Sequence, residues 1–326
     1  MTKIISLGAG RMGRGIAHVF AYAGYDVEIV DFKERPAADS EALLCEAKEE
    51  IRENLNFLMS LQVVTEDEAA ATLARVTGVS LAVSEDCLAQ ADYVFEGVPE
   101  TLEAKKDAIG RVSEIMKPDG VLASTTSTML STRLAEFSGR PSHFLNAHFL
   151  NPAYLIPLVE VSPSDQTEEA VTGRFIDLLK GIGKVPVRCK ATPGYIVPRL
   201  QSLVMSEACR MVEQGVATAE DIDNAVRSGF GLRFATMGPL EFVDWGGLDI
   251  LYYANQYLSS ELGERYQAPP IVDKMMAEGQ LGLKTGRGMY DFSGMDLDAY
   301  RTEKLSTFVA LLNHLDLMPK PARGKE

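Results

Sequence analysis

Three closely spaced glycines near the start of the chain constrain its fold more than any other feature. Gly8, Gly10 and Gly13 follow the spacing Gly-x-Gly-x-x-Gly. They come directly after the apolar run 3–7, which is typical of a buried parallel strand, and they lead into segment 13–25, whose apolar residues repeat at helical spacing. In such a turn the first glycine permits the bend, the second lets backbone approach a pyrophosphate, and the third lets helix and strand pack closely. The pattern predicts a β–α–β unit that holds a dinucleotide.

The acidic residue after the second predicted strand bears on which dinucleotide binds. Segment 26–30 alternates like a strand and ends at Asp31, 18 residues after the third glycine. A carboxylate at this place accepts a hydrogen bond from the ribose 2′-hydroxyl and repels a 2′-phosphate, which favours NAD over NADP. Lys33 and Arg35 lie close by in the sequence, so NADP stays open as the alternative.

Strand-like and helical segments alternate along the chain as far as residue 190. Further short apolar runs occupy residues 76–81, 93–98, 121–124, 144–147 and 158–161. This alternation predicts an α/β fold with a largely parallel, doubly wound sheet. Beyond the breaker pair Pro193-Gly194 the pattern is helical, with Thr218 as an N-cap candidate. We therefore expect a dinucleotide-binding domain at 1–190 and an all-helical domain at 191–326, frayed from residue 319 onward.

The charge balance bears on the partners that the chain can take. The net charge is -14, and the sequence shows no basic stripe of the kind that nucleic-acid binders carry. Ten acidic and three basic side chains lie within residues 34–68, which accounts for half of the net charge. This segment forms a solvated helix face, or it repels a polyanionic ligand over the roughly 8 to 10 Å that salt leaves unscreened.

The sequence offers neither a membrane span nor a metal site. No apolar stretch reaches the length needed to cross a bilayer, and the first strand begins too early to leave room for a targeting peptide. The four cysteines are isolated and lack Cys-x-x-Cys spacing, which argues against a disulfide framework and against structural zinc. We expect a cytoplasmic protein without a bound metal ion.

Two residues twelve positions apart indicate proton-transfer chemistry. His148 closes a strand-like run that His143 opens, and doubly wound sheets place their chemistry at the carboxyl ends of strands. Glu160 lies within the apolar run 158–161, where a carboxylate must be paired or neutralised. Pairing with His148 would fix the imidazole tautomer and raise its basicity, which suits a base near neutral pH. A structural histidine, and a glutamate bound to backbone or arginine, are the alternatives.

The stretch His148-Phe-Leu-Asn151-Pro152, followed by Pro157-Leu-Val-Glu160-Val, resembles the catalytic stretch of the L-3-hydroxyacyl-CoA dehydrogenase family. The resemblance covers most of the chain. The other matching motifs are Gly8-Ala-Gly-Arg11-Met12-Gly13, Val98-Pro-Glu100 with Lys105, Ser124-Thr-Thr-Ser127, Thr192-Pro-Gly-Tyr-Ile-Val197, Met237-Gly-Pro-Leu-Glu241 and Gly282-Leu-Lys-Thr-Gly286. The spacing of His148 and Glu160 is the most specific of these features.

The resemblance implies a fold, a cofactor and a set of roles. It implies a Rossmann-type domain that binds NAD through the glycine loop, Arg11 and Met12 included, and a helical domain that closes the cleft and forms a homodimer. His148 would be the general base in oxidation, and Glu160 would orient it. The remaining implied positions are Ser127 and Asn151 at the substrate oxygen or its neighbours, and Glu100 and Lys105 near the cofactor.

Departures from the family pattern weaken the CoA interpretation without removing it. Pro198 stands where the family places an asparagine that helps to hold the substrate carbonyl, and proline has neither a side-chain donor nor a backbone N–H. Thr125 replaces another family asparagine, a smaller change. Arg233 lies in a segment more similar to the gulonate and carnitine dehydrogenase branches, and it binds a substrate carboxylate or pairs with a nearby acid. The acidic segment 34–68 opposes polyanionic coenzyme A.

The sequence thus predicts an NAD-dependent oxidoreductase for a short-chain 3-hydroxyacyl-CoA, such as 3-hydroxybutyryl-CoA. A free 3-hydroxy carboxylate is the alternative substrate. The β-hydroxyacid dehydrogenases share the glycine motif, but the helix that starts at Pro198 lacks their catalytic lysine. A crystallin-like structural protein shares the wider fold, and the intact pair of His148 and Glu160 argues against that role.

Overall fold

The chain forms two compact units, which a computed structural model describes for residues 2–319. The units are Met1–Val204 and Met205–Glu326, and the division between them lies within helix α8 (Val197–Glu213). The domain boundary expected near residue 190 falls in the loop just before α8. The expected frayed tail lies, from residue 320, outside the described residues. Among residues 2–319, no helix combines the length and the apolar character that crossing a bilayer requires.

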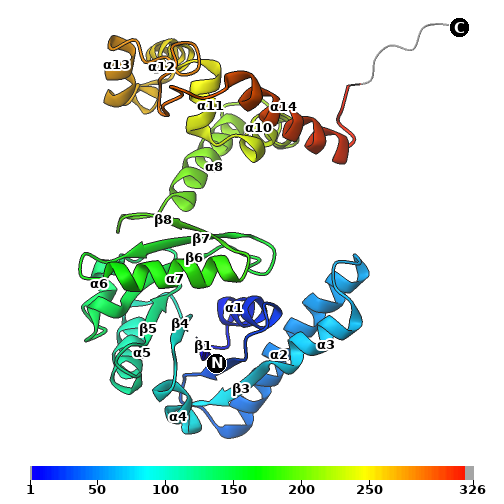
Figure 1. The fold of residues 1–326 in the computed structure, drawn as a ribbon, viewed down its shortest axis with the longest axis vertical. Coiled ribbons are helices and arrows are strands. Elements are labelled where there is room, and N and C mark those ends of the chain that lie inside the picture. Colours follow the sequence, from blue (N-terminus) through cyan, green and yellow to red (C-terminus); the bar gives the residue numbers. More distant parts are fainter. Residues whose placement is uncertain (1, 320–326) are drawn as a thin grey trace, which may run out of the picture. The chain divides into compact units, whose positions relative to one another are not determined.

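The first unit is built on one eight-stranded sheet with the order β3-β2-β1-β4-β5-β6-β7-β8 (Figure 1). Its strands are β1 (Ile4–Leu7), β2 (Val27–Asp31), β3 (Val76–Ser80), β4 (Tyr93–Glu96), β5 (Val121–Ser124), β6 (Phe144–Phe149), β7 (Leu158–Pro163) and β8 (Val185–Arg188). The strands from β3 to β6 are parallel, β7 runs antiparallel to β6, and β8 is parallel to β7. The predicted doubly wound, largely parallel sheet is confirmed.

Helices cover both faces of this sheet, as alternating strand residues show. Ile4 and Ile5 are both fully buried, yet they belong to different apolar clusters because successive strand side chains point to opposite faces. The Ile4 cluster includes residues of α1 (Arg11–Tyr22), α2 (Ala37–Ser60), α3 (Glu66–Ala74) and α7 (Glu169–Gly181). The Ile5 cluster includes residues of α4 (Glu85–Ala89), α5 (Leu102–Ile115) and α6 (Ser131–Ala135). Short 3-10 turns lie at Leu81–Val83 and Pro141–His143.

The described part of the second unit consists of helices and their connections, with isolated β-bridges between residues 282 and 291 in the segment before the last helix. Its elements after α8 are α9 (Ala219–Ala225), a π-helical turn (Val226–Phe230), α10 (Gly231–Thr236), α11 (Pro239–Gly246), α12 (Leu248–Leu262), a 3-10 turn (Glu264–Tyr266), α13 (Pro270–Ala277) and α14 (Leu297–His314). The predicted N-cap is confirmed, because the Thr218 side chain accepts a hydrogen bond from Asp221 N at 3.1 Å. The buried Asp244 carboxylate accepts the backbone N–H groups of Met289 and Tyr290 and so fixes the loop before α14.

Candidate active site

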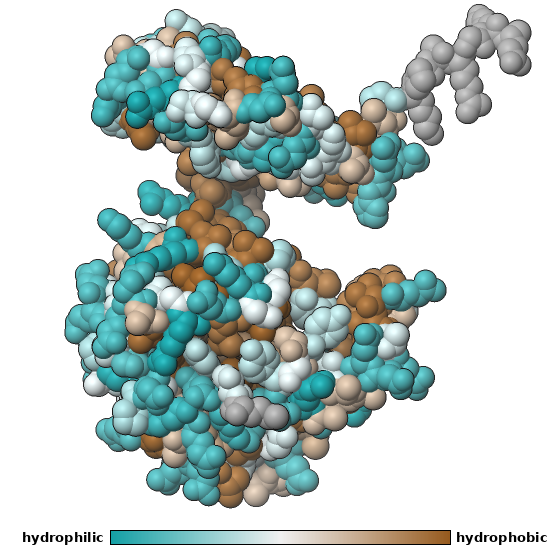
Figure 2. All heavy atoms as spheres, viewed as in Figure 1, coloured by the Kyte–Doolittle hydropathy of each residue, from teal (hydrophilic) through white to brown (hydrophobic). Residues whose placement is uncertain are grey.

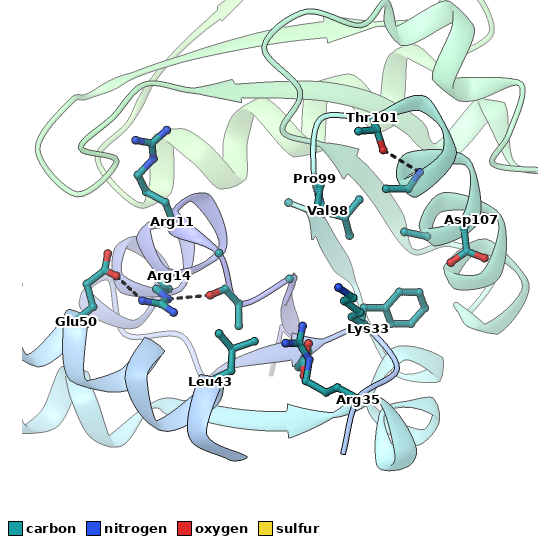
Figure 3. A pocket seen from close by; sticks show the side chains of 18 residues that line it. Arg11, Arg14, Lys33, Arg35, Leu43, Glu50, Val98, Pro99, Thr101 and Asp107 are labelled. Atoms are coloured by element: carbon teal, nitrogen blue, oxygen red, sulfur yellow. Dashed lines mark hydrogen bonds and ion pairs between the residues drawn. The ribbon is translucent and has the colours of Figure 1, made fainter. Parts of the chain in front are cut away.

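A cavity of about 910 Å³ lies at the carboxyl ends of β1, β2 and β4 (Figure 3). This edge is where the strand order reverses between β1 and β4, and doubly wound sheets bind nucleotides at such a point. Residues from all three strand ends line the cavity, among them Gly8, Gly10, Arg11, Asp31, Val98 and Pro99. The position and the lining fit a dinucleotide.

The three glycines of the first loop serve different purposes. Gly8 has a φ of +103°, and a Cβ there would lie 2.9 Å from the carbonyl oxygen of Gly97. A Cβ at Gly13 would lie 1.8 Å from the carbonyl oxygen of Gly8, so this glycine is required for packing of α1 on β1. A Cβ at Gly10 would meet no protein atom within 4 Å. Protein packing therefore does not explain Gly10, whereas the close approach of a pyrophosphate to the N-terminus of α1 does.

Asp31 lines the cavity at the end of β2 and is almost fully buried. Its Oδ2 accepts a hydrogen bond from Ser40 Oγ at 2.7 Å and lies 2.8 Å from Arg35 Nε. Lys33 and Arg35 both line the cavity beside it. The carboxylate expected to bind a ribose hydroxyl is thus held rigidly at the cavity wall by two neighbours.

Not every residue predicted near the cofactor lines this cavity. Met12 and Gly13 lie in the first turn of α1 and do not line the cavity. Glu100 and Lys105 also lie outside the lining, although their neighbours Pro99, Thr101 and Ala104 belong to it. Glu100 and Lys105 instead connect the cavity wall with the loop that follows β5.

This connection is a buried ionic network centred on Lys105, whose side chain is 1% exposed. Lys105 Nζ lies 3.0 Å from Glu96 Oε1 and 3.2 Å from Glu100 Oε2. Glu96, fully buried at the end of β4, also accepts hydrogen bonds from Ser124 Oγ at 2.6 Å and from Val98 N at 2.8 Å. A buried carboxylate of this kind is stable only when its lone pairs are satisfied, as they are here.

Glu100 extends the network to the loop that carries Ser127. Its carboxylate accepts hydrogen bonds from Ser127 N at 3.1 Å, from both the backbone and the hydroxyl of Thr128, and from the Thr126 hydroxyl. Burial alone would raise the pKa of Glu100, but the Thr126 hydrogen bond, the charge of Lys105 and the other hydrogen bonds lower the pKa below its usual value. Glu100 therefore binds this loop as a carboxylate at neutral pH.

His148 and Glu160 form a direct cross-strand pair. β6 and β7 are antiparallel, and their register places His148 opposite Glu160. His148 Nδ1 lies 2.8 Å from Glu160 Oε2, and both side chains are buried. The other carboxylate oxygen, Oε1, accepts the backbone N–H groups of Ile196 and Val197, each at 2.8 Å. The carboxylate is thus fixed from two sides, and it holds the Nδ1 edge of the imidazole in turn.

The remaining predicted site residues differ in how close they lie to this pair. Ser127 Oγ lies 3.2 Å from His148 Nε2, the ring nitrogen that Glu160 does not occupy. Asn151 is exposed in the loop after β6, and its side chain forms no hydrogen bond within residues 2–319.

Two residues that depart from the family pattern lie on helices. Pro198 occupies the first turn of α8. Arg233 lies on α10 in the second unit, where its guanidinium carbon is 5.3 Å from the centre of the Phe242 ring. It forms no ion pair with any described carboxylate.

Two residues of this site were missed in the sequence. Glu96 stands in the apolar run 93–98, so the reasoning that singled out Glu160 would also have found it. Tyr195 is buried and stacks on the His148 imidazole, with ring centroids 5.0 Å apart. Nothing in the local sequence pattern signals that contact.

Comparison with known proteins agrees with this geometry. The profile of the 3-hydroxyacyl-CoA dehydrogenase NAD binding domain matches residues 3–192, and the profile of the C-terminal domain of the same enzymes matches residues 194–292. The chain belongs to the 3-hydroxyacyl-CoA dehydrogenase family. It is therefore an NAD-dependent oxidoreductase with NAD as its cofactor, as the cavity and the glycine loop predicted.

Three relatives show how far the similarity extends. A probable 3-hydroxybutyryl-CoA dehydrogenase of Deinococcus radiodurans is 35% identical over 88% of this chain and 98% of its own. The structure of a 3-hydroxyacyl-CoA dehydrogenase from Archaeoglobus fulgidus is 30% identical, with a TM-score of 0.76, over 98% of this chain and all of that one. The structure of an NAD-dependent pyridine carboxylic acid 5-dehydrogenase is 28% identical, with a TM-score of 0.69, over 97% of this chain and 99% of that one.

Proposed function

We propose that the protein interconverts a short-chain 3-hydroxyacyl-CoA, such as 3-hydroxybutyryl-CoA, and the corresponding 3-ketoacyl-CoA. The observation that carries this proposal is the buried pair of His148 and Glu160 with the Ser127 hydroxyl on the second ring nitrogen. Relatives named for this activity support the substrate class.

The hydrogen bonds of Glu160 indicate which imidazole nitrogen acts as the base. Its Oε1 accepts two backbone N–H groups, and its Oε2 faces His148 Nδ1. An ionised carboxylate only accepts hydrogen bonds, so His148 Nδ1 carries the proton that faces Oε2. The Nε2 lone pair is then free for a hydroxyl proton.

In the oxidation direction we propose that His148 Nε2 takes the proton of the substrate hydroxyl while the C–H bond of the same carbon breaks. Bound NAD supplies the acceptor for that hydride. Ser127 Oγ, 3.2 Å from Nε2, would hold the substrate oxygen in line with the base, with Asn151 near that oxygen. In the reduction direction the protonated imidazole returns the proton to the carbonyl oxygen.

A free hydroxy carboxylate is the second candidate substrate. Arg233 lacks a carboxylate partner among the described residues, so its guanidinium is available for a two-pronged bond to a substrate carboxylate. Pro198 cannot supply the side-chain amide of the CoA enzymes. A structural relative named for a pyridine carboxylic acid covers 97% of this chain.

The discriminating experiment follows NADH absorbance with acetoacetyl-CoA, beside a panel of free 3-hydroxy acids with NAD. Turnover of acetoacetyl-CoA that survives Arg233→Ala supports the thioester substrate. If only a free acid is turned over, and this turnover is lost in Arg233→Ala, the thioester substrate is contradicted and the second candidate is supported. His148→Ala should abolish either activity, and retained activity in that variant would refute the proposed base.

We also propose a homodimer that assembles through the helical part of the chain. Large apolar side chains stay exposed along α8, where Leu203 is 67% and Met205 60% exposed (Figure 2). Such a face is typical of a surface that another subunit covers. Light scattering that gave a monomer would contradict the dimer.

We also propose a cytoplasmic location, with which the four free cysteines agree.

A further inference from the structure

Residues 194–197, at the entry to α8, contact both members of the proposed catalytic pair. Two consecutive backbone N–H groups, from Ile196 and Val197, bind Glu160. The Tyr195 ring stacks on the His148 imidazole, with centroids 5.0 Å apart and ring planes 5° apart. Parallel aromatic rings at this distance adopt the offset-stacked arrangement that their charge distribution favours. One short segment therefore holds the carboxylate by its edge and the imidazole by its face.

The hydroxyl of Tyr195 extends this contact to the loop that bears Ser127. It donates a hydrogen bond to the carbonyl oxygen of Thr126 at 2.8 Å and accepts one from Asn146 Nδ2 at 2.9 Å. Asn146 lies on β6, two residues before His148, and Thr126 directly precedes Ser127. Burial raises the pKa of Tyr195, so the phenol keeps its proton and continues to donate. It thus connects the strand of the base with the loop of the serine.

The backbone at Tyr195 adopts a conformation that serves this placement. Its φ is +44°, in the left-handed region that residues other than glycine seldom occupy, and Gly194 before it has a φ of +75°. Such conformations persist where the surroundings hold them, and they cluster at functional sites. The sharp turn brings the phenol over the imidazole while the next two N–H groups point at Glu160.

We propose that Tyr195 is a positioning residue for His148. The pairing with Glu160 holds one edge of the imidazole but leaves the ring free to tilt and to rotate away from Ser127. The stacked phenol fixes the plane of the imidazole, and its hydroxyl fixes the distance between the base and the serine loop. This inference rests on the proposed role of His148, so its test begins with a measurement that needs no turnover.

That measurement is the proton NMR signal of His148 Nδ1–H in the full chain, assigned by its loss in His148→Gln. Shielded by Tyr195 and bonded to Glu160, this proton should exchange slowly with water. The signal should persist in Tyr195→Phe, which keeps the ring, and disappear in Tyr195→Leu. Tyr195→Asn repeats the ring removal with a residue that tolerates positive φ, in case the leucine variant fails to fold.

A matched control comes from a second stacked pair in the same unit. Tyr154 stacks on His18 with centroids 4.9 Å apart and ring planes 19° apart. Tyr154→Leu should leave the His148 signal in place, which separates loss of this particular stack from general loosening of the fold.

Kinetics with acetoacetyl-CoA and NADH give the second readout. Tyr195→Leu should lower kcat about 100-fold, as expected for a base displaced by about 1 Å, and leave the KM for NADH unchanged. Tyr195→Phe, which keeps the ring but removes both hydrogen bonds of the hydroxyl, should lose only about fivefold in kcat. A leucine variant that keeps both the signal and kcat would overturn the proposal, as would a phenylalanine variant that falls as far as leucine. If the signal persists in Tyr195→Phe and is lost in Tyr195→Leu while the wild-type protein turns over no substrate, the positioning role is supported and the proposed function is refuted.

Discussion

Replacing Glu160 by glutamine is the sharpest test of the proposed base, because it removes one charge and almost no volume. Glu160 is fully buried and accepts three hydrogen bonds, two from backbone N–H groups and one from His148 Nδ1–H. The glutamine oxygen can still accept the two backbone groups. Its NH2 group then faces His148 Nδ1, and two donors meet.

The imidazole can relieve this conflict only by moving its proton to Nε2 or by turning away. In the first case Nε2 loses the lone pair that the reaction needs, and in the second it leaves Ser127. The same change of carboxylate to amide in the serine protease triad lowers kcat by about 10⁴ through the wrong tautomer. We therefore expect a fall of about 10³- to 10⁴-fold in kcat, equal to about 4 to 5.5 kcal/mol of lost transition-state stabilisation.

The assay follows initial rates with saturating NADH and acetoacetyl-CoA, with NADH affinity measured separately by fluorescence. NADH affinity should not change, since Glu160 lies outside the cofactor cavity. Glu28→Gln is the control, because Glu28 is also a strand carboxylate of this sheet and pairs with Lys3 instead of a histidine. If Glu160→Gln kept a third of the wild-type kcat, the orienting role of Glu160 would be wrong.

Three further predictions concern binding and stability. Gly13→Ala should abolish NAD binding in titration calorimetry, because its Cβ would lie 1.8 Å from a carbonyl oxygen of the glycine loop; tight binding would contradict this. Lys105→Met leaves a buried carboxylate unpaired and should cost about 3–5 kcal/mol of unfolding free energy in urea, against no change for an exposed lysine. Burial, with the charge of Lys184, lowers the pKa of His18 to about 4, below the unfolded value near 6.5. The unfolded chain then binds more protons, so stability should fall by about 3 kcal/mol from pH 6.5 to pH 4, and His18→Phe should remove that slope.

Most of the strands and the cofactor loop were predictable because each depends on a local pattern. The glycine spacing fixes a turn whose geometry admits no Cβ at Gly8 or Gly13. Apolar runs of four to six residues are typical of buried parallel strands, and those of β4, β5 and β7 were found within a few residues of their ends. β8 was missed because the sequence Val-Pro-Val-Arg is short, contains proline and lies at the sheet edge.

The network around Lys105 and the stack of Tyr195 on His148 could not be predicted in the same way. Lys105 lies on a helix with charged neighbours, and this local pattern predicts a solvent-exposed lysine side chain. Its burial follows from α5 packing on the sheet beside Glu96, a contact between separate elements. Tyr195 is 47 residues from His148, and no periodicity spans that distance.

The direction of β7 explains why a base and its carboxylate meet at this edge of the sheet. β6 leaves the sheet just after His148, and a parallel β7 would begin at the opposite edge, with its early residues far from that point. Because β7 instead runs antiparallel, the chain re-enters the sheet where β6 ended, and its third residue, Glu160, pairs with His148. The cavity wall after β4 opens at the same edge, and Lys105 ties that wall to the Ser127 loop. One reversal in an otherwise parallel sheet thus places a buried acid–base pair beside the serine loop that the cofactor wall supports.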